Sequence, residues 1–279
     1  MSFNKNIKLN LLKLRNIAII QARINSKRFP NKIFKKIGNY SCLELLLKRL
    51  KKSKLLDKII IASNDKSLII KKNFSEHKVE FFFGNDENVL KRYYDCCKKF
   101  KIKENDNIIR ITADCPFIDH QLLDKLLKTL SEKKLELITN TQPPTFPDGM
   151  DISIFKFYLL KKAYLKASKK YDLEHVTPYI HRIKNIKKEN YVDEVDFSTV
   201  RLTLDDITDL NFLNFVFDQL NQNIEFNYKK LKKLIFKLRK KNNEFKQNLF
   251  SNERNTGSEM SSGYKKWKHA ESLIPQGNM

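Results

Sequence analysis

Short apolar runs alternate with segments of helical periodicity from residue 17 to about residue 220. Between the runs, leucines recur with helical spacing, as in segments 43–50 and 122–130. Strands that alternate with helices in this way form a mainly parallel sheet covered by helices on both faces. The sequence therefore predicts an α/β fold, with one domain at residues 16–222. The runs with the composition of strands are residues 17–22, 58–63, 79–83, 107–112 and 135–139.

The composition is that of a globular protein rather than a disordered or membrane-spanning one. The chain has 279 residues, of which 41% are hydrophobic, enough to build a core. No apolar run approaches the ~18 residues of a membrane span. Charges at Lys13 and Arg15 interrupt the first apolar patch, unlike a signal peptide. Because the four cysteines also lack Cys-x-x-Cys spacing, we expect reduced thiols, no structural zinc and a cytoplasmic location.

The net charge of +23 raises the question of a polyanionic partner. More than half of this excess lies at the two ends of the chain. Residues 1–15 carry four cations and no acid, and residues 229–246 carry nine cations against one glutamate. The charge is therefore weak support for a nucleic-acid partner, and we expect no specific one.

The regions outside the main domain differ from it in composition. Residues 1–15 form a basic extension. Residues 223–248 have leucines on one helix face and lysines on the other, with Asn227 as the expected N-cap, which predicts a basic amphipathic helix that docks on the domain. Residues 249–279 have the composition of a linker followed by a further helical segment.

The loop after the first strand has the residues of a phosphate-binding loop. Asn25 and Asn31 tolerate left-handed backbone conformations, which such a loop requires. Its charged and hydroxyl side chains are those of Arg23, Ser26, Arg28 and Lys32. A solvated basic loop would have the same residues, and their spacing alone does not separate the two interpretations.

Two aspartates follow predicted strands and suit a magnesium site. Asp114 comes directly after the strand at 107–112, and Asp205 is expected to end a short strand, with Asp206 as the cap of the next helix. Carboxylates beside a phosphate loop can hold Mg²⁺ against a nucleotide. We therefore predict that Asp114 and Asp205 bind Mg²⁺ together.

A third polar group follows in the sequence. Asp148 precedes Gly149 in an expected tight turn, and Asp151 begins the next expected strand. Glu174 and His175 lie in a polar segment. These four acidic and imidazole side chains are candidate substrate-binding residues, although their pattern assigns none of them a chemical role.

Seven segments together resemble the CTP-dependent sugar cytidylyltransferases, over about residues 17–220. The resemblance is nearest to the spore-coat polysaccharide cytidylyltransferase-like branch, since Gln21 stands where the related CMP-Kdo and CMP-sialate synthetases usually have proline. The segments occur in the family's order: "IIQARINSKRFPNK", "IIIASND", "FFFGNDENVLKRYYD", "IIRITADCPFID", "FPDGMDISIF", "EHVTPYI" and "VRLTLDDITDL".

The resemblance implies a Rossmann-like fold of the glycosyltransferase-A type, found in nucleotide-diphospho-sugar transferases. It implies transfer of CMP from CTP to an acidic or modified sugar, with release of pyrophosphate and Mg²⁺ as cofactor, in surface polysaccharide biosynthesis. Arg92 is implied near the sugar. The residues implied to act in catalysis are Arg23, Lys32, Asp114 and Asp205. The residues implied at the nucleotide are Arg23, Ser26, Arg28, Lys32, Asp65 and Arg110.

Other readings stay open. A glycosyltransferase on the same fold would use a nucleotide-sugar donor, although "ADC" around Asp114 lacks the usual Asp-x-Asp pair. A nucleic-acid-binding module would use the basic ends of the chain. The final segment "GYKKWKHAESLIPQGNM" resembles the start of class III aminotransferases, which is consistent with fusion to such a domain. Separately, a homodimer is one possible assembly.

Overall fold

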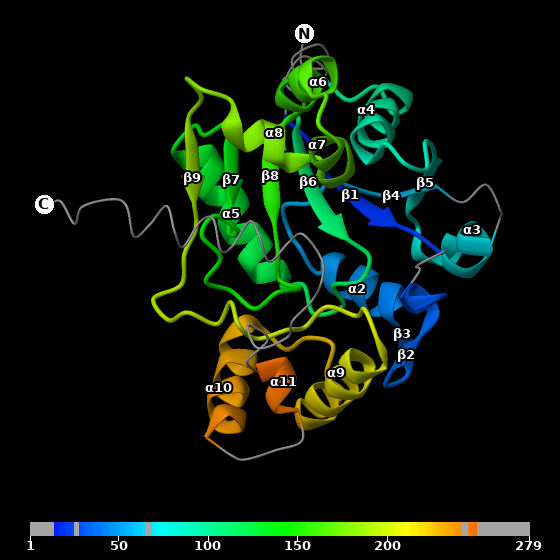
Figure 1. The fold of residues 1–279 in the computed structure, drawn as a ribbon, viewed down its shortest axis with the longest axis vertical. Coiled ribbons are helices and arrows are strands. Elements are labelled where there is room, and N and C mark those ends of the chain that lie inside the picture. The colour runs from blue at the N-terminus through cyan, green and yellow to red at the C-terminus, as the bar shows by residue number, and fades with distance from the viewer. Residues whose placement is uncertain (1–13, 25–27, 65–68, 241–244, 250–279) are drawn as a thin grey trace, which may run out of the picture.

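The computed structural model describes residues 14–24, 28–64, 69–240 and 245–249. A seven-stranded sheet forms its centre, in the order β5-β4-β1-β6-β8-β7-β9 (Figure 1). The strands are β1 (Asn16–Ala22), β4 (Lys58–Ser63), β5 (Glu80–Phe83), β6 (Asn107–Thr112), β7 (Leu137–Thr139), β8 (Ser153–Lys156) and β9 (Lys188–Asn190). A separate hairpin pairs β2 (Lys36–Ile37) with β3 (Tyr40–Ser41).

The sheet is mainly parallel, as the sequence predicts. Strands β5, β4, β1 and β6 run parallel to one another, and β9 runs parallel to β7. The strand β8 is antiparallel to both of its neighbours, β6 and β7. All five predicted strands are present, with starts that differ from the expected ones by no more than two residues.

Helices cover both faces of the sheet. Alternate residues of a strand point to opposite faces, and here both sets are apolar. Ala18 and Ile20 join the apolar cluster that contains α2, α5, α9 and α10, whereas Ile17 and Ile19 join the one that contains α4, α6 and α8. The helices are α2 (Cys42–Leu50), α3 (Ile69–Phe74), α4 (Val89–Lys99), α5 (His120–Glu132), α6 (Phe157–Lys166), α7 (Lys170–His175), α8 (Thr177–Arg182), α9 (Ile207–Gln219), α10 (Tyr228–Arg239) and α11 (Lys246–Leu249), with 3-10 turns η1 (Lys32–Phe34) and η2 (Ser75–His77).

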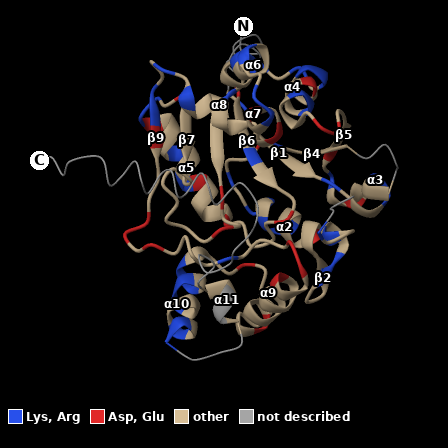
Figure 2. Ribbon diagram, viewed as in Figure 1, with Lys and Arg blue, Asp and Glu red and all other residues tan. Residues whose placement is uncertain are grey.

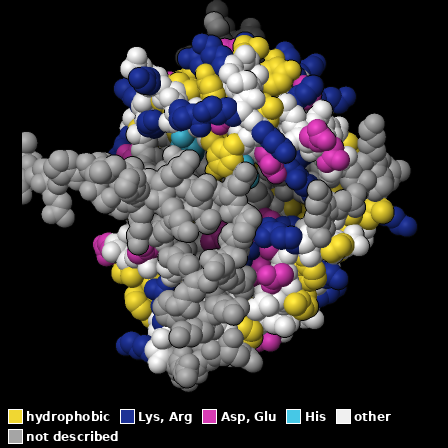
Figure 3. Space-filling model, in the orientation of Figure 1, with side chains coloured by type: hydrophobic (Ala, Val, Ile, Leu, Met, Phe, Trp, Pro, Cys, Tyr) yellow, Lys and Arg dark blue, Asp and Glu magenta, His cyan; other side chains and the backbone are white. Residues whose placement is uncertain are grey.

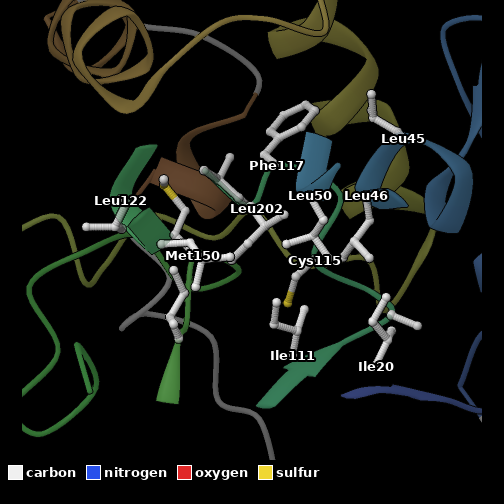
Figure 4. Close-up of a cluster of buried hydrophobic side chains, with 14 of the residues drawn as sticks. Ile20, Leu45, Leu46, Leu50, Ile111, Cys115, Phe117, Leu122, Met150 and Leu202 are labelled. Carbon is white, nitrogen blue, oxygen red and sulfur yellow. The ribbon is translucent and has the colours of Figure 1, made fainter. Parts of the chain in front are cut away.

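The first of these clusters is the larger part of the core. Figure 4 shows Ile20 and Ile111 of the sheet facing the leucines of α2, with Phe117 beside them and Met150 near Leu202. All of these side chains are buried. Because Met150 and Leu202 belong to segments that carry acidic residues of the site, the core also fixes where those segments lie.

Side-chain caps explain where several helices begin. In each case a side-chain oxygen of the cap accepts a hydrogen bond from a backbone N–H of the first turn, which would otherwise have no partner. Ser41 also forms a full capping box with Glu44. The capping residues are Ser41 of α2, Asn88 of α4, Asp119 of α5, Asp206 of α9 and Asn227 of α10.

The basic helix docks on the domain, as expected. Leu231, Ile235 and Leu238 of α10 are buried in the larger cluster, while most of its lysines are exposed. Figure 2 shows the basic residues along this helix. The helices α9, α10 and α11 lie together at one end of the molecule (Figure 1). On the face shown in Figure 3, lysine and arginine side chains are spread widely and acidic ones form small groups among them.

One local prediction is wrong. Residues 201–204 do not form a strand, because they make only an isolated parallel bridge, between Arg201 and Asp148. Beyond that bridge, no strand of the described sheet pairs with the segment. All four cysteines are free and buried. In the described ranges, no helix has both the length and the apolar character needed to cross a membrane.

Arg49 ties α2 to the segment before α10. Its guanidinium is fully buried and donates to the carbonyl oxygens of Ile118, Ile224 and Phe226 at 2.7–3.0 Å. It also lies 3.6 Å from the centroid of the Phe226 ring. Burial lowers the pKa of Arg49 to about 10, so the group stays charged at neutral pH.

We expect Arg49→Met to lower the free energy of unfolding by about 3 kcal/mol, because it leaves several buried carbonyl groups without donors. Urea denaturation measures the change. Lys48→Met on the same helix is the matched control, since Lys48 is half-buried and its ion pair with Glu44 spans 3.8 Å. The control should change stability by less than about 1 kcal/mol. Equal effects of the two substitutions would contradict the role of Arg49.

Candidate active site

The candidate site begins where β1 and β6 end side by side. Gln21 pairs with Thr112 in the parallel register, and the N–H of Ala113 donates to the carbonyl of Gln21 at 3.0 Å. The cationic loop after β1 and the aspartate after β6 therefore leave the sheet at the same edge. This carboxyl edge is where ligands bind in open α/β sheets.

A third segment, distant in sequence, reaches the same place through backbone hydrogen bonds. The N–H of Leu204 donates to the carbonyl of Asp114 at 2.9 Å, which sets Asp205 beside Asp114. The segment also pairs with Asp148, whose carbonyl accepts from the N–H of Leu202 at 2.7 Å. Gly149 permits this approach, because a Cβ there would lie 2.7 Å from the carbonyl carbon of Leu202.

Lys32 lies at the centre of the site. Its Nζ is 2.5 Å from Oδ2 of Asp114 and 2.8 Å from Oδ1 of Asp205. Arg28 adds a second cation, with a terminal guanidinium nitrogen 3.1 Å from the same oxygen of Asp205. The side chain of Lys32 is 12% exposed, and those of Asp114 and Asp205 are 22% and 14% exposed, so water screens these charges only in part.

The backbone of the loop presents Lys32 in this direction. Asn31 has a φ of 57°, in the left-handed region, as expected for an asparagine in a phosphate-binding loop. Its N–H closes the loop on the carbonyl of Ile24 at 3.2 Å. The following Ile33 is fully buried and anchors η1 in the core. Lys32 is thus held between a fixed turn and a buried side chain.

The charges at the centre stabilise one another. Burial alone would raise the pKa of Asp205, but Lys32, Arg201 and Arg28 together lower it to about 2. Burial alone would lower the pKa of Lys32, whereas Asp114 and Asp205 raise it overall. Asp205 and Lys32 are therefore both charged at neutral pH.

Arg201 is a site residue that the sequence reasoning missed. Its guanidinium contacts Asp148, Asp205 and Asp209, with Asp148 at 3.0 Å and Asp209 at 3.1 Å. It precedes an apolar alternation, "LTL", and resembles an ordinary polar residue at a strand end. The one sequence signal for this ion-pair cluster is spacing: Arg201, Asp205 and Asp209 are each four residues apart.

Other predicted residues form a second group beside the first. Arg23 lies 4.0 Å from Glu174, and its contacts do not include the central aspartates. Burial lowers the pKa of His175, and Arg110 and Arg23 contribute to that decrease against the effect of Glu174. The structure thus places Arg23, Arg110 and Glu174 within electrostatic reach of His175, at the end of α7.

Arg92 belongs to this second group. It is fully buried on α4 and donates to the carbonyls of Asn85, at 2.5 Å, and Asp86, at 3.3 Å. Burial, reinforced by the charge of Arg23, lowers the pKa of Arg92 to about 10. Among the described residues, its Nε and one terminal nitrogen have no hydrogen-bond partner. This side of the site is therefore positively charged.

Asp148 and Asp151 lie between the two groups. Burial, with neighbouring aspartates, raises the pKa of Asp148 to about 6 although Arg201 opposes it. Burial and the charge of Asp148 raise the pKa of Asp151 to about 7, with Arg110 opposing. Asp148 is engaged with Arg201, so its predicted role in substrate binding stays a prediction. Two further predicted residues, Ser26 and Asp65, lie outside the described residues.

The central acids fit a magnesium ion. Asp114 and Asp205 direct one oxygen each at a single positive group, and carboxylate oxygens are the ligands that Mg²⁺ prefers. Within the described part of the chain, no three His, Cys, Asp or Glu side chains gather as a metal cage. Two carboxylates are the usual protein share of a Mg²⁺ site that is completed by phosphates and water.

A mainly parallel sheet with cations and paired aspartates at its carboxyl edge defines an α/β nucleotide-binding enzyme. Comparison with known proteins gives the family. The family model described as "Cytidylyltransferase" matches residues 17–256, and the chain belongs to this family. This confirms the resemblance seen in the sequence and makes the protein a nucleotidyltransferase that uses CTP. The match continues past residue 222, and the predicted domain boundary there stays a prediction.

Three proteins with related sequences can be compared with this chain. An uncharacterised protein of Methanocaldococcus jannaschii is 37% identical over 216 residues, covering 75% of this chain and 86% of that protein. The spore coat polysaccharide biosynthesis protein SpsF of Bacillus subtilis is 34% identical, over 39% of this chain and 47% of SpsF. A 3-deoxy-manno-octulosonate cytidylyltransferase of Fusobacterium nucleatum is 33% identical, over 42% of this chain and 47% of that enzyme.

Solved structures show the same fold. A cytidylyltransferase from Leptospira borgpetersenii superposes with a TM-score of 0.75 at 32% identity, covering 82% of this chain and 96% of that one. The structure of CMP:2-keto-3-deoxy-manno-octonic acid synthetase complexed with CTP superposes with a TM-score of 0.58 at 14% identity, over 74% of this chain and 99% of that one. The second likeness concerns the fold alone.

We expect Gly149→Ala to damage both stability and activity. The residue has a φ of 104°, and an added Cβ would lie 2.7 Å from the backbone of Leu202. The free energy of unfolding should fall by roughly 2–4 kcal/mol. Turnover should fall as well, because the displaced segment carries Asp205. Thermal unfolding and pyrophosphate release measure the two effects, and wild-type values for both would show that the close approach is not needed.

Proposed function

We propose that the protein transfers CMP from CTP to a hydroxyl of an acidic or modified sugar, releasing pyrophosphate. The observation that carries this proposal is the convergence of Asp114 and Asp205 on Lys32, beside Arg28, at the carboxyl edge of the sheet. The family supplies the nucleotide and the reaction type. We further propose that the reaction occurs in the cytoplasm, where free cysteines stay reduced.

In this reaction the sugar hydroxyl attacks the α-phosphorus of CTP, and the bond to the β-phosphate breaks in line. Phosphoryl-group chemistry of this kind depends on positioning and charge stabilisation more than on covalent catalysis. Lys32 and Arg28 would bind the phosphate oxygens of CTP. Lys32, with Arg23 from the neighbouring group, would stabilise the charge that develops on departing pyrophosphate.

Asp114 and Asp205 are proposed as the Mg²⁺ ligands. When bound, Mg²⁺ neutralises charge on phosphate oxygens and makes the phosphorus easier to attack. Because Asp205 has a pKa of about 2, its carboxylate is available as a ligand across the physiological pH range. Lys32 would exchange its contacts with the two acids for contacts with the triphosphate.

The second group of residues is proposed to bind the sugar. In the part of the chain that the structure describes, the buried guanidinium Nε atoms of Arg92 and Arg110 have no hydrogen-bond partner. The charge of Arg23 acts on Arg92 and on His175, and that of Arg110 acts on His175. The positive charge on this side of the site favours an acceptor with a carboxylate. The name of the Fusobacterium relative, a 3-deoxy-manno-octulosonate cytidylyltransferase, supports an acid sugar. The name of SpsF supports a role in surface polysaccharide biosynthesis.

Asp114→Asn and Asp205→Asn should each lower the rate of pyrophosphate release from CTP by about 10³-fold or more, because each removes a charged ligand of the proposed Mg²⁺. Both variants should remain folded, since the substitution keeps the side-chain shape. Asp95→Asn on α4 is the control, because Asp95 pairs with Lys91 at the surface. Retained turnover in both site variants would refute the metal assignment.

The acceptor proposal predicts a preference for acid sugars. With CTP and Mg²⁺, a sugar that carries a carboxylate should be turned over at least about 100-fold more efficiently than its neutral amide, since charged hydrogen bonds to arginine are lost in the amide. Pyrophosphate release with each sugar of a matched panel measures this ratio. Equal turnover of acid and amide would refute the acid-sugar assignment while leaving cytidylyl transfer intact.

A further inference from the structure

Arg201 engages three aspartates with one guanidinium. One terminal nitrogen bonds Oδ2 of Asp148 at 3.0 Å, the other bonds Oδ2 of Asp205, and Nε lies 3.1 Å from Oδ1 of Asp209. The side chain of Arg201 is 15% exposed and that of Asp209 is 1% exposed. Burial alone would lower the pKa of Arg201, but the three acids raise it, so the guanidinium stays charged.

These contacts orient Asp205. Because Arg201 takes Oδ2, the other oxygen, Oδ1, faces Lys32 at 2.8 Å and Arg28 at 3.1 Å. The backbone is fixed too, since the N–H of Asp205 donates to Oδ2 of Asp209 at 2.9 Å. One oxygen of the proposed metal ligand is thus held by the scaffold, and the other is presented to the site beside Asp114.

The short helix α11 supports this arrangement from behind. The carbonyl of Asn248 accepts the N–H of Arg201 at 2.7 Å. Its side-chain amide donates to Oδ1 of Asp209 at 3.1 Å. Asn248 is fully buried, so these bonds are protected from water. Asn248 therefore links the C-terminal part of the described chain to the acids of the site by hydrogen bonds.

We propose that Arg201 is a positioning residue that fixes the Asp205 carboxylate in its metal-binding orientation, and that Asn248 holds Arg201 and Asp209 in place. The inference rests on the proposed function only in assigning Asp205 to Mg²⁺. A lysine cannot replace Arg201, because a single ammonium cannot reproduce the planar fork that spans three carboxylates. Side chains that orient metal ligands in this way typically change metal affinity by about 10–100-fold when removed.

The test measures metal affinity directly, apart from turnover. Mn²⁺ is titrated into the full-length protein with CTP present and the sugar withheld, and free Mn²⁺ is followed by electron paramagnetic resonance against a reference that contains CTP alone. Arg201→Lys and Arg201→Gln should each weaken Mn²⁺ binding by about 10–100-fold. Asn248→Ala keeps the charge of Arg201 and should weaken it several-fold. Pyrophosphate release from CTP is measured on the same samples.

Arg15→Gln is the matched control. Arg15 also binds a buried carboxylate, that of Asp106, through two nitrogens at 2.9 Å and 2.6 Å, but at the opposite end of β6. The Arg15→Gln substitution removes a comparable ion pair that is remote from the site. The Mn²⁺ affinity should therefore stay within about twofold of wild type. Thermal unfolding of all variants compares their stability.

Three results would overturn the proposal. One is wild-type Mn²⁺ affinity in folded Arg201 variants or, should these not fold, in Asn248→Ala. Another is an equal loss of affinity in Arg15→Gln, which would mean that general destabilisation is the cause. The third is a wild-type protein that releases pyrophosphate from CTP yet binds no Mn²⁺, which would leave the proposed cytidylyl transfer standing. If the Mn²⁺ affinity depends on Arg201 but the wild-type protein releases no pyrophosphate, the proposed function would be contradicted instead.

Discussion

The ammonium group of Lys32 joins two carboxylates that lie 82 and 173 residues away along the chain. The sheet delivers Lys32 and Asp114 to the same edge, and the electrostatic pairing brings Asp205 to them. Burial, together with the charge of neighbouring aspartates, raises the pKa values of Asp148 and Asp151. The cations of the site offset the repulsion between its acids, and the same arrangement is suited to a metal-bound triphosphate.

The scaffold supports this pairing at several levels. Backbone hydrogen bonds place residue 204 against Asp114, and the absence of a side chain at Gly149 lets the two segments approach. Arg201 then orients Asp205, and Asn248 holds Arg201 from a helix near the end of the described chain. Arg201 is 15% exposed, whereas Asn248 behind it is fully buried. Residues behind a metal ligand can fix its orientation in this way.

Much of this arrangement was predictable from local patterns. The strands follow from apolar runs, the caps from Asp206 and Asn227, and the position of Asp114 and Lys32 from their places after strands. The segment before Asp205 was wrongly predicted as a strand, because its alternation is that of a strand although it forms only an isolated bridge with Asp148. Arg201 and Asn248 were missed because their partners are set by tertiary contacts, which composition and periodicity do not encode.

The central claim is that Asp114 and Asp205 share one divalent ion on the nucleotide. The most direct measurement is a crystal structure of the protein with CTP and Mn²⁺, with the ion located by its anomalous scattering. The account predicts one ion bound by a carboxylate oxygen from each of Asp114 and Asp205, with Lys32 moved onto the triphosphate. An ion bound elsewhere, with both acids still paired to Lys32 beside a fully bound nucleotide, would contradict it.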